Sequence, residues 1–103
     1  MGRIEKLLEY LESGGKDSFL QHALALEYIK IGEDAKAREL FDEILLREPT
    51  YVGSYYHLGK LLERAGESDK AMTTYRRGME EAKRAGEDRT YNELRGALEE
   101  IEA

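Results

Sequence analysis

The sequence contains no cysteine and no tryptophan, and it has a single proline among 103 residues. Without cysteine the chain has no disulfide bond, no thiolate zinc site and no thiol nucleophile. Its uncharged apolar stretches are only a few residues long, so we expect no segment that spans a bilayer. Basic residues are outnumbered, with 16 Lys and Arg against 22 Asp and Glu. The net charge of −6 argues against non-specific binding to nucleic acid or to an anionic membrane.

The composition is that of a folded domain. Hydrophobic residues make up 41% of the chain, and the charged residues, 37%, are of mixed sign, which does not fit a disordered tail. The length fits a single small domain, covering residues 1–103. The first residues lack the apolar core of a signal peptide, and Lys6 stands where a myristoylation site has Ser or Thr. We therefore expect a cytoplasmic protein.

Glycine and proline divide the chain into pieces of helical length, and the apolar residues between them recur with a helical spacing. No segment shows a sustained strand pattern. The spacing predicts an all-α chain of about six helices, at 3–12, 18–31, 34–47, 51–65, 68–85 and 88–102.

The turns carry recognisable signals. Gly32 and Gly66 each follow an apolar stripe, where a left-handed residue can end a helix. We expect Asp34 and Ser68 to cap the helices that follow. Pro49 lacks an N–H group and disfavours helix at the residue before it, so it predicts a stop.

The two central helix pairs repeat with a period of 34 residues, because a shift by that distance places Leu24 on Leu58, Gly32 on Gly66 and Ala37 on Ala71. This is the period of the tetratricopeptide repeat, whose motif has an aromatic residue, Leu-Gly, Tyr, Ala, an aromatic residue and Pro. The second unit reads Tyr55, Leu58-Gly59, Leu62, Ala71, Tyr75 and Lys83 at those positions, and the first reads Gln21, Leu24-Ala25, Tyr28, Ala37, Phe41 and Pro49.

The sequence therefore resembles the tetratricopeptide repeat family, with departures at Gln21, Leu62 and Lys83. The resemblance implies a right-handed α–α superhelix, with repeats at 18–51 and 52–85. The helix at 3–12 resembles the second half of a missing repeat, and the helix at 88–102 would cap the stack. Because Lys83 replaces the motif proline, we expect the helix before it to run on to Ala85.

The chain offers little for catalysis. His22 and His57 are the only histidines, and neither has a metal-ligand partner at helical spacing. No phosphate-binding loop follows Gly14-Gly15, and no serine lies in a nucleophile elbow. We expect no enzyme activity, no metal and no cofactor.

The resemblance implies a protein- or peptide-binding module with a concave groove lined by the first helix of each repeat. Carried over by register, the groove residues are Phe19, His22, Leu26, Ile29, Lys30, Tyr56, Lys60, Glu63, Arg64, Arg89 and Asn92. Lys60 and Arg64 lie one turn apart on one face, so they can meet an acidic or C-terminal carboxylate group, or pair with Glu63 or Glu67 on the surface.

Self-assembly is an alternative function. The apolar patch formed by Phe19, Leu26 and Ile29 could pair with its own copy by two-fold symmetry, which would give a homodimer.

Overall fold

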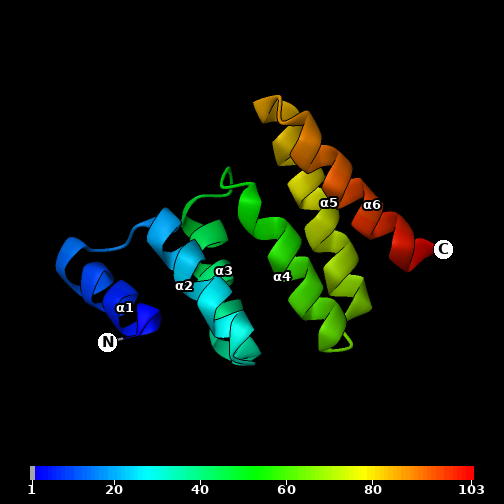
Figure 1. Cartoon of the computed structure of the whole chain (residues 1–103). Helices are drawn as coiled ribbons and strands as arrows, with labels where there is room; N and C mark the ends of the chain where they lie inside the picture. Colours follow the sequence, from blue (N-terminus) through cyan, green and yellow to red (C-terminus); the bar gives the residue numbers. More distant parts are fainter. Residues whose placement is uncertain (1) are drawn as a thin grey trace. The chain divides into compact units, whose positions relative to one another are not determined.

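The computed structural model describes residues 2–103, and every regular element in this range is an α-helix (Figure 1). The helices are α1 (Arg3–Gly14), α2 (Ser18–Lys30), α3 (Asp34–Arg47), α4 (Gly53–Arg64), α5 (Ser68–Ala85) and α6 (Asp88–Glu102). The prediction of an all-α chain of about six helices is confirmed. None of the helices in residues 2–103 combines the length and the apolar character needed to cross a bilayer.

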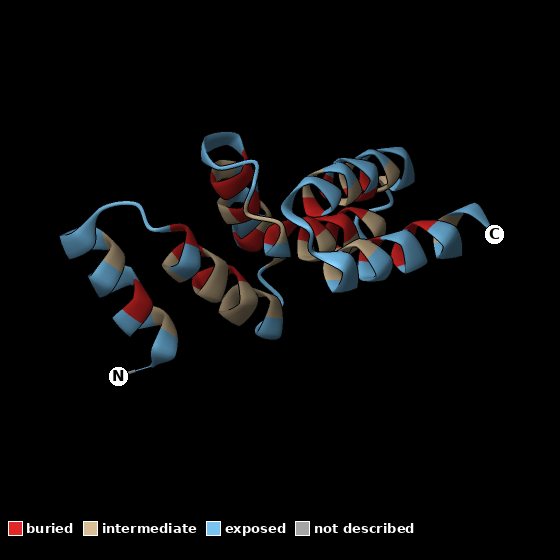
Figure 2. Cartoon of the chain, turned by 90° about the horizontal axis from the view of Figure 1, so that it is seen from above, coloured by how far each residue is buried: buried red, intermediate tan, exposed pale blue. Residues whose placement is uncertain are grey.

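The chain forms two compact units. The first, called unit 1, ends at Glu48 and contains α1, α2 and α3. The second, called unit 2, begins at Pro49 and contains α4, α5 and α6. In both units the buried residues lie on the helix faces that pack together, as the red segments of Figure 2 show.

In unit 1, α2 contacts both α1 and α3. This central position explains its composition, because only Glu27 and Lys30 are charged among its 13 residues. Asp17 starts the helix by accepting a hydrogen bond from the Leu20 N–H at 3.0 Å. The apolar core of the unit consists of Leu7, Leu24, Ala25, Ala37, Phe41, Ile44 and Leu45.

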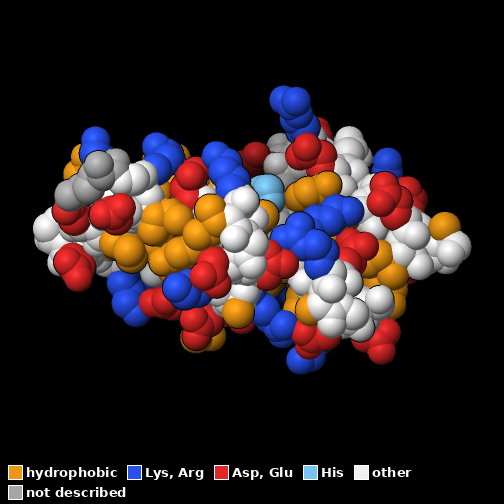
Figure 3. Space-filling model, turned by 60° about the horizontal axis from the view of Figure 1, so that its bottom comes forward, with side chains coloured by type: hydrophobic (Ala, Val, Ile, Leu, Met, Phe, Trp, Pro, Cys, Tyr) orange, Lys and Arg blue, Asp and Glu red, His pale blue; other side chains and the backbone are white. Residues whose placement is uncertain are grey.

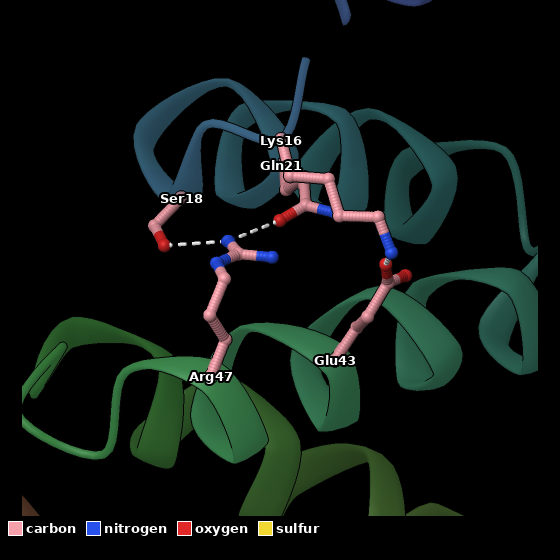
Figure 4. Close-up of polar contacts among 5 residues, drawn as sticks. All are labelled: Lys16, Ser18, Gln21, Glu43 and Arg47. Carbon is pink, nitrogen blue, oxygen red and sulfur yellow. Dashed lines mark hydrogen bonds and ion pairs between the residues drawn. The ribbon is translucent and has the colours of Figure 1, made fainter.

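Gln21 occupies the motif's first aromatic position, and the structure shows why a polar residue is stable there (Figure 4). The Arg47 guanidinium donates hydrogen bonds to Gln21 Oε1 at 2.6 Å and to Ser18 Oγ at 2.8 Å. Ser18 Oγ in turn donates to Glu48 Oε1 at 2.9 Å. The buried amide and hydroxyl groups are therefore paired, which removes most of the desolvation penalty of burying them.

In unit 2, α5 packs against α4 and α6, and α4 also contacts α6. Tyr55 and Tyr75 are fully buried between these helices. Each lies against a glycine of the facing helix: a Cβ atom on Gly59 would stand 2.1 Å from Tyr75 Cε1, and one on Gly78 would stand 2.6 Å from Tyr55 Cβ. Only glycine fits beside the Tyr75 ring, so the motif glycine at position 59 allows α4 and α5 to approach closely.

The turns within the helix pairs share one backbone geometry. Gly32 and Gly66 both have φ of +79°, as predicted for left-handed helix ends. The following residue donates its N–H group back to the last helical turn, from Glu33 to Tyr28 O and from Glu67 to Leu62 O, at 2.9 Å in both cases.

The capping prediction at Asp34 and Ser68 is wrong. The capping residues are Glu33 and Glu67, neither of which makes a side-chain capping bond. Because the glycine turn closes in so few residues, Asp34 and Ser68 already lie inside the next helix.

Eight of the twelve predicted helix ends agree with the structure, and four differ by one or two residues, among them the end of α2 at Lys30 rather than 31 and the end of α4 at Arg64 rather than 65. α3 ends at Arg47, just before Glu48-Pro49, and α5 runs on to Ala85. α1 extends to Gly14, beyond the predicted end at residue 12. α4 begins at Gly53 rather than 51, because the Ser54 and Tyr55 N–H groups bond to carbonyls three residues back, which forms a turn before the helix.

Candidate functional site

The predicted groove residues of unit 1 lie on one side of α2. Phe19 is open to solvent, with 70% of its surface exposed. Leu26 and Ile29 are half-buried, and Lys30 is exposed with its Nζ 3.1 Å from Glu27 Oε2. Hydrophobic side chains gather on the face of unit 1 that Figure 3 presents. The α2 surface can therefore offer apolar area to another molecule, with charge only near its end.

His22, predicted with this set, belongs partly to the core of unit 1. Its ring lies edge-on to the buried ring of Phe41, with 5.5 Å between the ring centroids. This geometry is favourable for two aromatic rings, so His22 helps to hold α2 against α3.

In unit 2 the predicted residues of α4 form a connected cluster around Lys60. Its Nζ atom lies 3.6 Å from Glu63 Oε2 and 3.8 Å from Glu100 Oε2, and 5.5 Å from the centroid of the Tyr56 ring. The pairing of Lys60 with Glu63, one of the two alternatives weighed from the sequence, is confirmed. The contact with Glu100 adds a link from α4 to α6.

Tyr75, a buried residue of α5, contacts this cluster from the core side of α4. Its hydroxyl group donates a hydrogen bond to Glu63 Oε2, and its ring lies 6.5 Å from that of Tyr56. Burial and the bond to Glu63 raise the pKa of Tyr75 well above its ordinary value, so the hydroxyl stays protonated and keeps donating. The Glu63 carboxylate is thereby fixed in position beside Lys60.

His57 lies next to the cluster. Its ring is edge-on to Tyr56, with 5.7 Å between centroids. Burial lowers the pKa of His57 below its ordinary value, and the Glu93 carboxylate on α6 partly opposes that change. Near neutral pH the imidazole is therefore uncharged, and the positive charge of this cluster comes from Lys60.

The remaining predicted residues, Arg64, Arg89 and Asn92, are exposed. Arg89 and Asn92 share one side of α6 with Gly96, since these positions follow each other at intervals of three and four. A Cβ atom on Gly96 would meet nothing within 4 Å, so this side of α6 is open.

Sequence reasoning missed Glu100 and Tyr75 as members of the unit 2 cluster. Tyr75 occupies a motif position that predicts only a buried aromatic residue. Glu100 is one of several glutamates near the end of the chain. Nothing in the spacing distinguishes the carboxylate that reaches Lys60 from its neighbours. Within residues 2–103, no three His, Asp or Glu side chains gather as a metal site requires.

The arrangement of these helices agrees with the comparisons with known proteins. A family model described as "Tetratricopeptide repeat" matches residues 52–84. The crystal structure of a tetratricopeptide repeat domain protein from Salinibacter ruber is 41% identical, covers 84% of this chain and 97% of its own, and has a TM-score of 0.82. The chain belongs to the tetratricopeptide repeat family.

Two further solved structures resemble this tetratricopeptide repeat domain. A solution NMR structure of the Salinibacter ruber domain protein is 41% identical, with a TM-score of 0.81, and the match covers 84% of this chain and 88% of that one. A solution structure of a Bordetella parapertussis protein is 24% identical, with a TM-score of 0.84 and coverage of 98% and 88%, which supports the fold alone. A search of curated proteins found no match.

Membership of the family sets the broad class of function. Tetratricopeptide repeat domains are in general non-catalytic modules, and the fold indicates a protein–protein interaction or scaffold role.

Proposed function

We propose that this tetratricopeptide repeat domain binds a segment of a partner protein on the face of unit 2 that α4 and α6 form. The binding is non-catalytic. One observation carries the proposal: the ammonium group of Lys60 lies among aromatic and acidic side chains from both helices, and both of its ion pairs are long, at 3.6 and 3.8 Å.

Those distances leave hydrogen-bonding capacity on Lys60. An ammonium group has three N–H donors, and charge-assisted N–H···O bonds are about 2.7–2.9 Å long, shorter than either pair here. A carboxylate of a bound segment could take such a bond without breaking a short one. Arg64 lies one turn further along α4 and adds a second positive charge on that side.

The ligand that fits this face is an extended segment with an acidic side chain or a free C-terminal carboxylate. Its carboxylate would meet Lys60, its apolar groups would lie on the Tyr56 ring, and its backbone could approach α6 closely at Gly96, where no side chain intervenes. The groove roles of Arg89 and Asn92 remain part of this proposal. The cytoplasmic location stays a prediction from the sequence.

The test is an affinity purification with the full chain as bait, followed by binding measurements on the purified partner. The charge-reversed variant Lys60→Glu/Arg64→Glu should lose the partner. The matched control Lys83→Glu/Arg84→Glu makes the same change in net charge at exposed positions of α5, and it should retain the partner. Circular dichroism must show unchanged helix content in both. Identical partner sets for all three baits would refute the proposal.

A second candidate function is self-association through unit 1, and the exposure of Phe19 favours it. Phe19, Leu26 and Ile29 would then pair with the same residues of a second copy. Light scattering across a concentration series tests this possibility, since a constant monomer mass would exclude it.

A further inference from the structure

Unit 1 has a second apolar surface, on the side of α2 away from Phe19. It is an open trough of about 620 Å³ between α1 and α3, with Leu24 and Tyr28 of α2 among the residues that line it. Successive helix residues are about 100° apart, which places these two positions opposite the side shared by Phe19 and Leu26. The other lining residues are Leu8, Lys36, Glu39, Leu40, Asp42, Glu43 and Leu46.

The leucines at the edge of this trough are unusually open for large apolar side chains. Leu46 is 87% exposed and Leu8 is 41% exposed. Single exposed leucines are common on protein surfaces, but here two of them line one concavity together with Leu40 and the ring of Tyr28.

The second repeat provides an internal control, because it has the same fold without these residues. The 34-residue shift places Thr74 at the position of Leu40 and Glu80 at the position of Leu46. A tetratricopeptide repeat therefore does not need a leucine at either place in order to fold. The apolar lining is a property of this surface of unit 1.

The charges around the trough are also specific to unit 1. Its lining includes three carboxylates, Glu39, Asp42 and Glu43, and one basic residue, Lys36. The same shift places Arg76 on Asp42 and Arg77 on Glu43, so the second repeat carries the opposite charge there.

Neighbouring basic groups are already engaged. The Lys36 ammonium lies 5.5 Å from the centroid of the Tyr28 ring and 4.0 Å from Glu33 Oε2. Lys16 makes a hydrogen-bonded ion pair with Glu43, and the two side chains point toward one another in Figure 4. The trough thus combines an apolar floor with a net acidic rim.

We propose that this trough is a docking site for a basic amphipathic helix of another protein. Such a helix would place apolar side chains at i, i+4 and i+7 on the leucines, and Lys or Arg side chains on its flank against Glu39. The length of the trough agrees with such a helix. Its lining residues on α3, from Lys36 to Leu46, cover about 15 Å along the helix axis, and the three apolar side chains of the docked helix would cover about 10 Å. The proposal is independent of the unit 2 face.

Charge also favours a partner over a second copy of this chain. The chain carries a net charge of −6, and α1, an amphipathic helix of its own, contains three glutamates against one Arg and one Lys. Such a helix would bring like charge to an acidic rim, which opposes docking.

The test uses the full chain and a defined probe, a fluorescent helical peptide of about 15 residues with leucines at i, i+4 and i+7 and lysines on both flanks. Fluorescence anisotropy should show saturable binding that weakens as salt is added. Leu46→Glu should weaken binding by about tenfold to a hundredfold, the loss expected for one buried leucine. It should leave the fold intact, because the second repeat carries Glu80 at that position.

A matched control separates this effect from a general change of charge. Tyr10→Glu adds the same charge at a residue of α1 that is 58% exposed and lies on the other side of the helix from Leu8, so binding should stay within about twofold of the wild type. A peptide with glutamate in place of lysine should not bind, since it meets the acidic rim.

Four results of experiments with the peptides would overturn the proposal. They are no binding of the lysine peptide, equal binding of the glutamate peptide, equal binding by the Leu46→Glu variant, and amide chemical-shift changes in α4 and α6 rather than in α1 and α3. A concentration-dependent dimer that Leu46→Glu abolishes would identify the occupant as a second copy and would also overturn it. Because the unit 2 face is tested with other variants, its failure and the failure of the trough are distinguishable.

Discussion

Replacing either of two helical glycines of unit 2 by alanine should change stability in opposite directions. Alanine is favoured over glycine inside a helix by about 1 kcal/mol, because glycine loses more backbone freedom on folding. At Gly96 a Cβ atom would meet nothing within 4 Å. Gly96→Ala should therefore stabilise the protein by up to about 1 kcal/mol.

At Gly59 the same substitution meets the Tyr75 ring. The new Cβ atom would lie 2.1 Å from Cε1 and 2.5 Å from Cζ, whereas carbon atoms pack best at about 3.5–4.0 Å. The ring cannot move freely, because it is fully buried and its hydroxyl group is bonded to Glu63. Overpacking of this kind costs about 1–3 kcal/mol, and an overlap this large belongs at the upper end. After the propensity gain, Gly59→Ala should destabilise by about 2 kcal/mol.

The two variants should therefore differ by about 3 kcal/mol in the free energy of unfolding. Urea denaturation followed by circular dichroism measures this difference, and thermal melting should show it as a separation of more than about 10 °C. Because both variants make the same chemical change in helices of one unit, helix propensity alone predicts no difference. Equal stabilisation by both would refute the close contact between α4 and α5.

Two further predictions concern the core and its response to pH. Ala71→Arg, at a fully buried position of α5, should abolish the cooperative melt, because it forces excess volume and a charge into a close contact; an unchanged melting temperature would contradict this packing. The pKa of His57 is lower in the folded protein, so the unfolded chain binds more protons at mildly acidic pH. The contribution of His57 to the free energy of unfolding should therefore be fully present above about pH 6.5, and the protein should lose stability as the pH falls from 6.5 toward the folded-state pKa. His57→Gln should flatten the dependence of unfolding free energy on pH in that range, and an unchanged slope would show that another group causes it.

Much of the fold could be predicted because the chain contains two copies of the same 34-residue repeat motif. Gly32 and Gly66 each end a helix, and the agreement between them made a weak local signal specific. Lys83 in place of proline was enough to predict that α5 runs on to Ala85. The capping prediction failed at Asp34 and Ser68 because a residue type alone does not show how tightly the glycine turn closes.

The surfaces were harder to predict, because they depend on how helices approach one another. Glu100 is distant from Lys60 in sequence and is close only because α6 packs beside α4. Leu40 and Leu46 lie outside the repeat motif, so a search for that motif does not single them out, and they come together only where α1 and α3 enclose the space over α2. In each case the sequence did not show which helices pack side by side.

The placement of α2 between the two proposed surfaces has a thermodynamic consequence. One side of this 13-residue helix carries Phe19 and the other carries Tyr28, and its backbone is common to both. A displacement of the helix axis that improves the fit of a molecule on one side also alters the opposite side. A molecule that displaces the helix on binding one side would change the affinity for a molecule on the other side, and by reciprocity the factor must be the same in both directions.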